Sequence, residues 1–335
     1  MRLGLVGYTN KSSGIGLFIY ELWKYLEADS ILSINAGVKG QEVWTERQLT
    51  ANRPPNRGVI ETYFKRFEPT HVLFMETPFS TSLYDLAEKY GVNTCGIPMH
   101  ETFETGRMRP DLIICPCYEA WRKVGRDKLL FLPIGLELFP FKLRTGHTFV
   151  LNIGYGGPHD RRQSIRVVQA FSQLEDPAAR LIINSQANNW PKEIAVIQDS
   201  RITKNLGSRP LPEDIYAEGD IAINVMAYGG YERPILESMA SGMPCLTVNA
   251  DPMNLFQHDK DFLINPSPWL IKSSQWVVNT WYNAVSVEDI KAKLEWLLGI
   301  DTEKYSRWAR AQAVAQSWDG PIDYKSTWLE ALKSA

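Results

Sequence analysis

The 335-residue sequence predicts an α/β protein with two doubly wound parallel-sheet domains in tandem and a C-terminal helical tail. Short apolar segments alternate with segments of helical periodicity, and this alternation stops near residue 139 and restarts near residue 148. The chain is also too long for one typical hydrophobic core. We therefore expect a first domain at residues 1–145, a second at 146–302, and a tail at 303–335 that packs back on the first domain.

In the first domain, short apolar runs without polar alternation are typical of strands that are buried on both faces of a parallel sheet. Apolar residues with helical spacing follow the first run from residue 15 onward, and a second helix is expected at residues 82–90. The expected strands are residues 3–6, 71–75, 94–98, 112–115 and 129–132.

Residues 139–147 have no periodicity and carry Pro140 and Gly146, which indicates a linker between the domains. After it, a helix is expected at residues 162–174, a short helix at 215–218, and mainly helical structure from 287 to the end. The expected strands of the second domain are residues 149–153, 180–184, 221–225 and 245–248.

Composition excludes several classes of protein. A formal net charge of −2 and a pI near 6.3 provide no global basic field for nucleic acid or an anionic membrane. No apolar run is long enough for a membrane span, and the first ten residues lack the apolar core of a signal peptide. Four cysteines without disulfide or metal-ligand spacing indicate reduced thiols, so a cytoplasmic protein is expected.

The segment IGYGGPHDRRQS, residues 153–164, combines Gly156 and Gly157 with an expected helix start and the adjacent Arg161 and Arg162. Glycines permit close backbone approach to a ligand, and helix-terminal N–H groups and guanidinium groups both bind phosphate. The segment therefore suits a diphosphate, although a tight strand-to-helix turn with solvated arginines also explains it. Its spacing matches neither the GxGxxG dinucleotide pattern nor a P-loop.

The segment GGYERPILESMASGMP, residues 229–244, predicts one short helix between two breaks. Pro234 suits the first helical turn, and Gly242 with the proline two residues later ends the helix. Packing against a sheet explains the apolar and small residues but leaves Glu232 and Glu237 unexplained. An acid in the first turns is favoured by the helix dipole, and its carboxylate can accept two hydrogen bonds from a ribose.

This segment resembles the donor domain of retaining GT-B glycosyltransferases of the family 4, group 1 type, which carries E-G-F-G-L-P-x-x-E-A-M-A-S-G-x-P. Three more stretches are similar to the same family: NLGSRPLPEDIYAEGDIAINV, LLFLPIGLELFPF and KSSGIGLFIYELWKYL. Together they cover nearly the whole chain. The resemblance implies a GT-B fold, in which two Rossmann-like domains face a central cleft. It also implies a sugar nucleotide, UDP-glucose-like, as co-substrate, with no prosthetic group and no required metal.

By this resemblance, Glu237 holds the donor ribose, Arg162 with Arg161 binds the diphosphate, and backbone N–H groups at residues 233–236 meet the phosphates. The family's first acid, which contacts the donor sugar, falls on Gly229, and Glu232 is the candidate that replaces it. The implied catalytic residues are His100, Glu232 and Arg162, and the implied donor-binding residues are Gly14, Gly16, Gly156, Gly157, Arg161, Arg162, Gly230, Tyr231, Arg233, Ile235 and Glu237.

Two expected strand ends in the first domain carry further candidates. Glu76 follows one strand, and His100 and Glu101 follow the next. The family commonly has a histidine in this second loop, which implies His100 near the reacting sugar; from the residues alone, a structural imidazole explains it. Glu76 and Glu101 are candidate acceptor ligands or simple loop acids.

The implied activity is transfer of a hexose to a hydroxyl acceptor with retention. The stretches METPF and DLIICP are loosely similar to glycosyltransferases encoded by bacteriophages, which suggests a hydroxymethylated base in phage DNA as acceptor. Alternatives are a glycan or small-molecule acceptor, a non-catalytic sugar-nucleotide binding module, and an epimerase. Cations that could contact DNA phosphates, or simply form a solvated face, are Arg53, Arg57, Lys65, Arg66, Arg107 and Arg109.

Overall fold

The chain forms two compact units. Unit 1 comprises Met1–Glu137 with Pro321–Ala335, and unit 2 comprises Leu138–Gly320. The computed structural model describes residues 1–11, 13–35, 41–76, 79–99, 109–117, 129–154, 160–187, 190–207, 209, 211–272, 277 and 279–335.

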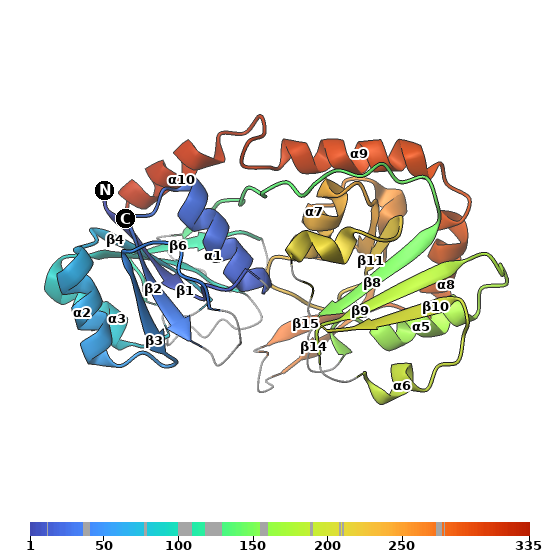
Figure 1. The fold of residues 1–335 in the computed structure, drawn as a ribbon, viewed down its shortest axis with the longest axis horizontal. Helices are drawn as coiled ribbons and strands as arrows, with labels where there is room; N and C mark the ends of the chain where they lie inside the picture. The colour runs from blue at the N-terminus through green and yellow to red at the C-terminus, as the bar shows by residue number, and fades with distance from the viewer. Residues whose placement is uncertain are drawn as a thin grey trace. The chain divides into compact units, whose positions relative to one another are not determined.

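Unit 1 is built on a sheet that, within the described residues, has seven strands, all paired in parallel (Figure 1). The order across this sheet is β3-β2-β1-β4-β5-β6-β7. The strands are β1 (Leu3–Gly7), β2 (Ser30–Asn35), β3 (Gln48–Asn52), β4 (His71–Met75), β5 (Asn93–Ile97), β6 (Leu112–Cys115) and β7 (Leu129–Phe131), and the helices are α1 (Gly14–Tyr25), α2 (Arg57–Phe67), α3 (Ser82–Tyr90) and α10 (Tyr324–Lys333).

Helices cover both faces of this sheet (Figure 1). α2 and α3 lie side by side on one face, where Glu61 accepts hydrogen bonds from Lys89 Nζ and Tyr90 Oη, both at 2.7 Å. α1 and α10 lie on the other face, and Trp328 Nε1 of α10 donates to the Pro133 carbonyl (3.0 Å). Strands covered on both sides must be apolar throughout, which explains the buried residues along β1, β4 and β6.

Unit 2 repeats this plan with a parallel sheet of six strands among the described residues, in the order β10-β9-β8-β11-β12-β13. A separate antiparallel hairpin, β14–β15, follows β13. The strands are β8 (Thr148–Gly154), β9 (Arg180–Ser185), β10 (Ile202–Leu206), β11 (Ile221–Asn224), β12 (Cys245–Val248), β13 (Leu263–Ile264), β14 (Ser267–Ile271) and β15 (Thr280–Ala284), and the helices are α5 (Ser164–Ser172), α6 (Lys192–Ala195), the 3₁₀ segment η2 (Pro212–Tyr216), α7 (Arg233–Ala240), α8 (Val287–Leu297) and α9 (Thr302–Ala315).

In both sheets the chain runs outward from the first strand in one direction and then returns to the other side of it. This doubly wound order places a topological switch point between β1 and β4 in unit 1 and between β8 and β11 in unit 2. Ligands of such sheets bind outside the carboxyl ends of the strands at the switch point. The predicted doubly wound α/β class is therefore confirmed, and its two switch points mark where to look for a site.

The segment expected to be a linker, residues 139–147, packs on unit 2. Buried Arg144 donates to the carbonyls of Tyr216 (2.6 Å), Gly219 (2.7 Å) and Ser241 (3.2 Å), which ties the segment to unit 2. The chain then passes from α9 in unit 2 to α10 in unit 1. The unit boundaries consequently fall at residues 137/138 and 320/321, and the tail divides between the units.

Six strands of the structure, β2, β3, β10, β13, β14 and β15, were not predicted from the sequence. β3 and β10 carry polar residues and lie at sheet edges, so an apolar run could not indicate them. All four cysteines are buried, and none forms a disulfide. None of the described helices is long and apolar enough to cross a membrane.

Candidate functional site

Three elements of unit 2 meet at its switch point. β8 ends at Gly154, β11 ends at Asn224, and Arg162 precedes α5. Arg162 Nη1 donates to Asn224 Oδ1 (3.2 Å), and a Cβ atom added to Gly154 would lie 3.7 Å from Arg162 Nη2. The guanidinium group therefore lies across the carboxyl ends of the two central strands.

Arg161 and Arg162 place two cations at this position. The Nε atoms of both are buried, and neither has a hydrogen-bond partner among the described residues. Burial, followed by the charge of Arg161, lowers the pKa of Arg162, while Glu232 acts in the opposite direction. Arg161 adds a second positive charge beside the desolvated guanidinium group of Arg162, so an anion bound at the strand ends would relieve an existing cost.

Gln163 fixes the start of α5 in a strained conformation. Its φ of 47° lies in the left-handed region, which non-glycine residues rarely adopt. Its side chain donates to the carbonyls of Val225 (3.3 Å) and Asn283 (3.0 Å) and accepts from the Val285 N–H (2.9 Å). These three bonds hold the arginines in place relative to β11 and the hairpin. Backbone strain held by surrounding bonds is typical of functional sites.

Glu232 is the second strained residue of the site. It is the N-cap of α7, with φ of 48°, and only 7% of its surface is exposed. Asn224 Nδ2 donates to its Oε2 (3.3 Å). A Cβ atom added to Gly229 would overlap the Glu232 carboxylate, so this carboxylate occupies the space that a side chain at position 229 would need.

Glu237 lies in the middle of α7 and is also buried. Tyr216 Oη donates to its Oε2 (3.0 Å), and Arg233 Nε donates to its Oε1 (3.3 Å). Burial, then Glu237, raises the pKa of Tyr216 well above its ordinary value, so the phenol remains a donor. A carboxylate has about four acceptor positions, which leaves two for a ligand.

α7 has a proline in its first turn and hydrogen-bonded carbonyls at its C-terminal end. Pro234 occupies the first turn, where its missing N–H costs nothing. At the other end, Arg310 Nη1 donates to the Ala240 carbonyl (2.5 Å) and Arg144 Nη2 to the Ser241 carbonyl (3.2 Å). Two cations at a helix C-terminus stabilise the helix, because they interact favourably with the negative end of its dipole. The helix is thus held at its C-terminal end, while the two acids lie at its N-cap and in its middle.

The remaining predicted donor-binding residues of unit 2 differ in burial and in the contacts they make. Tyr231 is buried and packs edge-on against Phe256, with ring centroids 5.0 Å apart. Ile235 belongs to the core, and its N–H already donates to the Glu232 carbonyl (3.1 Å). Gly230 is buried in the loop before α7. Gly156 and Gly157 lie outside the described residues.

In unit 1, several polar residues follow the carboxyl ends of the strands. Glu76 directly follows β4 with φ of 66°, and Arg53 Nη1 donates to Tyr8 Oη (2.8 Å). Burial raises the pKa of Tyr8, while the charge of Arg53 lowers it and that of Glu76 raises it. Glu76 therefore follows a strand end within electrostatic range of the Tyr8 phenol, which is bonded to a cation.

Two predicted donor-binding glycines, Gly14 and Gly16, lie near the start of α1, and the structure requires glycine at only one of these positions. A Cβ atom added to Gly16 would overlap the Asn10 carbonyl, so the close turn before α1 requires glycine there. Gly14 is exposed and has no atom within 4 Å of an added Cβ atom. His100 and Glu101 lie outside the described residues.

Sequence reasoning missed three residues of this arrangement: Tyr216, Asn224 and Gln163. Tyr216 and Asn224 lie within the quoted stretch NLGSRPLPEDIYAEGDIAINV, but their roles depend on side-chain contacts. An amide that ends an otherwise apolar strand was the available signal for Asn224. Nothing in the sequence indicated that Gln163 would adopt a left-handed backbone.

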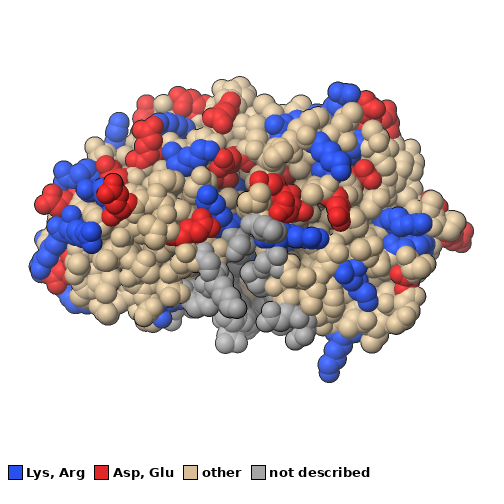
Figure 2. All heavy atoms as spheres, viewed as in Figure 1, with Lys and Arg blue, Asp and Glu red and all other residues tan. Residues whose placement is uncertain are grey.

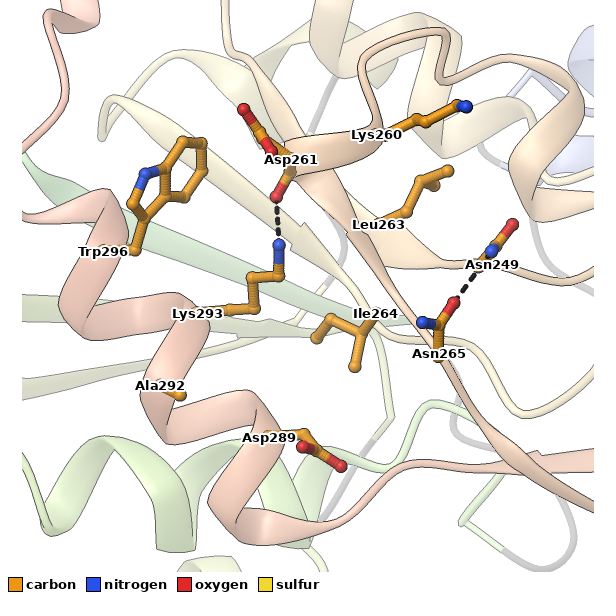
Figure 3. Close-up of a pocket in the computed structure, with 10 residues that line it drawn as sticks. All are labelled: Asn249, Lys260, Asp261, Leu263, Ile264, Asn265, Asp289, Ala292, Lys293 and Trp296. Carbon is orange, nitrogen blue, oxygen red and sulfur yellow. Dashed lines mark hydrogen bonds between the residues drawn. The ribbon is translucent and has the colours of Figure 1, made fainter.

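A cavity of about 750 Å³ lies elsewhere in unit 2, between the edge strand β13 and α8 (Figure 3). Its polar groups are largely bonded to one another: Lys293 Nζ donates to the Asp261 carbonyl (2.6 Å), and Asn249 Nδ2 donates to Asn265 Oδ1 (2.8 Å). It contains none of the predicted site residues. The candidate site therefore remains the switch point of unit 2.

Three of the six candidate DNA-contacting cations have polar partners. Arg57 lies 3.4 Å from Asp85, Lys65 lies 3.3 Å from Glu61, and Arg53 is bonded to Tyr8. Arg107 lies outside the described residues. The face shown in Figure 2 mixes acidic and basic side chains without a large basic patch.

Neither a protein-family model nor a curated protein sequence matches the chain. Solved structures of glycosyltransferases do resemble it. A glycosyltransferase from Rickettsia africae ESF-5 has a TM-score of 0.72 and 14% identity, covering 99% of this chain and 98% of that one. HepE from Anabaena, in complex with UDP-glucose, has a TM-score of 0.70 and 12% identity over 99% of both chains.

The lipopolysaccharide outer core galactosyltransferase WaaB has a TM-score of 0.69 and 11% identity, covering 100% of this chain and 99% of that one. Similarity over whole chains at such low identity establishes the fold. The predicted GT-B fold, with two parallel-sheet Rossmann-like domains, is therefore confirmed.

Proposed function

We propose that this protein is a glycosyltransferase that moves a hexose from a nucleotide-diphosphate sugar, UDP-glucose-like, to a hydroxyl acceptor with retention. The observation that carries this proposal is the position of Glu232. Its carboxylate fills the side-chain space of Gly229, where the family resemblance places the acid that contacts the donor sugar. The acid lost from position 229 is thus supplied three residues later.

The other groups around this carboxylate suit the rest of a sugar nucleotide. Arg161 and Arg162 supply two cations for the diphosphate, and Glu237 offers remaining acceptor positions for the two ribose hydroxyls. HepE, one of the similar structures, was solved with UDP-glucose bound, which supports a UDP-sugar as donor.

The chemistry follows from these charges. The bond between the anomeric carbon and the diphosphate oxygen breaks, and the leaving diphosphate is stabilised by Arg161 and Arg162. The acceptor hydroxyl forms its bond to the anomeric carbon on the face that the leaving group vacates, and its proton passes to a diphosphate oxygen. Glu232 stabilises the positive charge that develops on the sugar ring. Because the arginines supply the required charge, the proposal needs no metal ion, and activity should persist in EDTA.

The proposed roles of the unit 1 residues are less specific. Glu76 is proposed as an acceptor ligand because it directly follows β4 within electrostatic range of Tyr8. His100 near the reacting sugar and Glu101 near the acceptor remain predictions from the resemblance. A hydroxymethylated DNA base and a simple glycan both remain predicted acceptors, and the pairing of Arg57 and Lys65 with acids favours the glycan.

The test compares Arg162→Ala with a matched control, Arg166→Ala. Arg166 lies four residues later, in α5, and donates to the Val285 carbonyl (2.7 Å). Slow hydrolysis of UDP-glucose and binding of UDP are measured for both, by mass spectrometry and calorimetry. Arg162→Ala should lose hydrolysis by about a hundredfold or more, while Arg166→Ala keeps it. Normal turnover of Arg162→Ala would refute the proposal.

The same measurements distinguish an enzyme from a binding module. A protein that binds UDP-sugars tightly, without hydrolysis and without transfer to any acceptor in a panel, would be a sugar-nucleotide binding module. The acceptor panel should include hydroxymethylated DNA and neutral glycans.

A further inference from the structure

The β14–β15 hairpin of unit 2 exposes large apolar side chains. Trp269 retains 49% of its surface in solvent, Leu270 40% and Trp281 45%. In the strand register Trp269 is opposite Tyr282, and Leu270 is opposite Trp281. Residues directly opposite each other share a face of the hairpin, so Trp269 and Trp281 lie on different faces.

One of these faces is continuous with the candidate site. Tyr228, the residue before Gly229, lies with its ring centroid 6.2 Å from that of Tyr282, which in turn stacks on Trp269 at 4.7 Å and 22°. The first two rings are buried, and Trp269 is half-exposed. The three rings form an aromatic ladder that starts beside Gly229 and ends at an exposed indole.

The ladder is firmly anchored. Asn283 donates to the Ala227 carbonyl through both its backbone N–H (2.8 Å) and its Nδ2 (3.0 Å), and its own carbonyl accepts from Gln163. Gln163 is the residue after the two arginines. Trp269 therefore stacks on a residue of β15, the strand that is bonded to both the arginine segment and the loop before α7. A pre-positioned ring loses little conformational freedom when a ligand binds.

The charge of the hairpin selects among possible ligands. Among its described residues, Lys272 is the only one with a formal charge at neutral pH. A polyanion such as DNA, or an anionic membrane, requires several cations. An exposed aromatic ring in a hairpin whose described residues carry a single cation instead suits a neutral ring, because its negative π-face attracts weakly positive C–H groups. A pyranose presents such C–H groups on its apolar side.

We propose that Trp269 is a stacking surface for a neutral sugar ring of the acceptor, beside the donor site. This deepens the proposed function and rests on it, because the acceptor role assumes that transfer occurs. The tryptophan on the opposite face, Trp281, provides a matched control. It has similar exposure but takes no part in the ladder.

The experiment measures binding of maltotriose, cellotriose and chitotriose to the full chain by saturation-transfer NMR. Wild type is compared with Trp269→Ala, Trp269→Phe and Trp281→Ala, and UDP binding is measured for each. At least one trisaccharide should bind wild type, and Trp269→Ala should weaken it by about tenfold or more. Trp269→Phe should lose less, Trp281→Ala should match wild type, and UDP affinity should be unchanged in all four.

The stacking proposal would be overturned if wild type bound no trisaccharide, or if Trp269→Ala bound it as well as wild type. It would also be overturned if Trp269→Ala instead lost binding to a DNA duplex, to phosphatidylcholine–phosphatidylglycerol vesicles or to a second copy of the chain, because Trp269 would then serve another partner. Failure of the proposed function has a different signature, because then wild type would neither bind UDP nor hydrolyse UDP-glucose, whatever the trisaccharides do.

Discussion

Replacement of Glu232 by glycine should separate activity from stability. A non-glycine residue in the left-handed region costs about 1–2 kcal/mol, and glycine removes that cost at φ 48°. The same change removes the hydrogen bond from Asn224 to a charged group, which contributes about 1.5–3 kcal/mol. The two terms oppose each other, so the free energy of unfolding should fall by about 2 kcal/mol at most.

Turnover should respond very differently. If the Glu232 carboxylate stabilises the reacting sugar, its removal should lower the rate of UDP-glucose hydrolysis by about a hundredfold. UDP affinity should stay within a few-fold of wild type, because Arg161, Arg162 and Glu237 are unchanged. The rate is measured by mass spectrometry, UDP affinity by titration calorimetry, and stability by thermal unfolding.

Glu68→Gly is the matched backbone control. Glu68 also has a left-handed backbone, with φ of 47°, but it ends α2 in unit 1 with an exposed side chain. This variant should be slightly stabilised and fully active. Wild-type turnover in Glu232→Gly would refute the role of Glu232 as the donor-sugar acid. Loss of UDP affinity as large as the loss of turnover would instead assign it to nucleotide binding.

Three further predictions address the supports of the site. Arg144→Ala should reduce the free energy of unfolding by about 3 kcal/mol or more in denaturant titrations, because it strands several buried carbonyl groups. Tyr216→Phe should weaken UDP binding about fivefold to tenfold in calorimetry, because Glu237 loses one of its two donors; unchanged affinity would argue against the ribose role. Hydrogen bonds, led by that from Lys89, hold the pKa of Glu61 at about 2, below its ordinary 4.5. Its stabilising effect is complete above pH 4.5 and lost as the pH falls through 2, so the difference in Tm between wild type and Glu61→Gln should disappear over that window.

The sequence predicted most of the fold because buried parallel strands must be apolar on both faces. Runs such as residues 71–75 and 245–248 have no polar alternation, and no other element explains them as simply. The strands that were not predicted lack such continuous buried apolar runs. β10 is an edge strand with lysine and asparagine, and the β14–β15 hairpin exposes its apolar residues to solvent instead of burying them.

The site was only partly predictable. Helix start and stop signals, together with the family resemblance, located Glu237 and Arg162, because both lie at fixed positions in recognisable segments. Their supports could not be found in this way. Tyr216 reaches Glu237 across 21 residues of sequence, and Gln163 bonds to Asn283 across 120. Contacts of this kind depend on the packed sheet, which composition and periodicity do not encode.

The overlap between Gly229 and the Glu232 carboxylate has an evolutionary consequence. The side chains at positions 229 and 232 would occupy the same space, so a side chain at 229 fits only when position 232 carries a residue smaller than glutamate. Substitution at either site alone passes through a crowded or an acid-free intermediate. We expect homologous chains to covary here, pairing glycine at 229 with an acid at 232, or an acid at 229 with a small residue at 232. A motif search that requires the acid at one fixed position would overlook the first group.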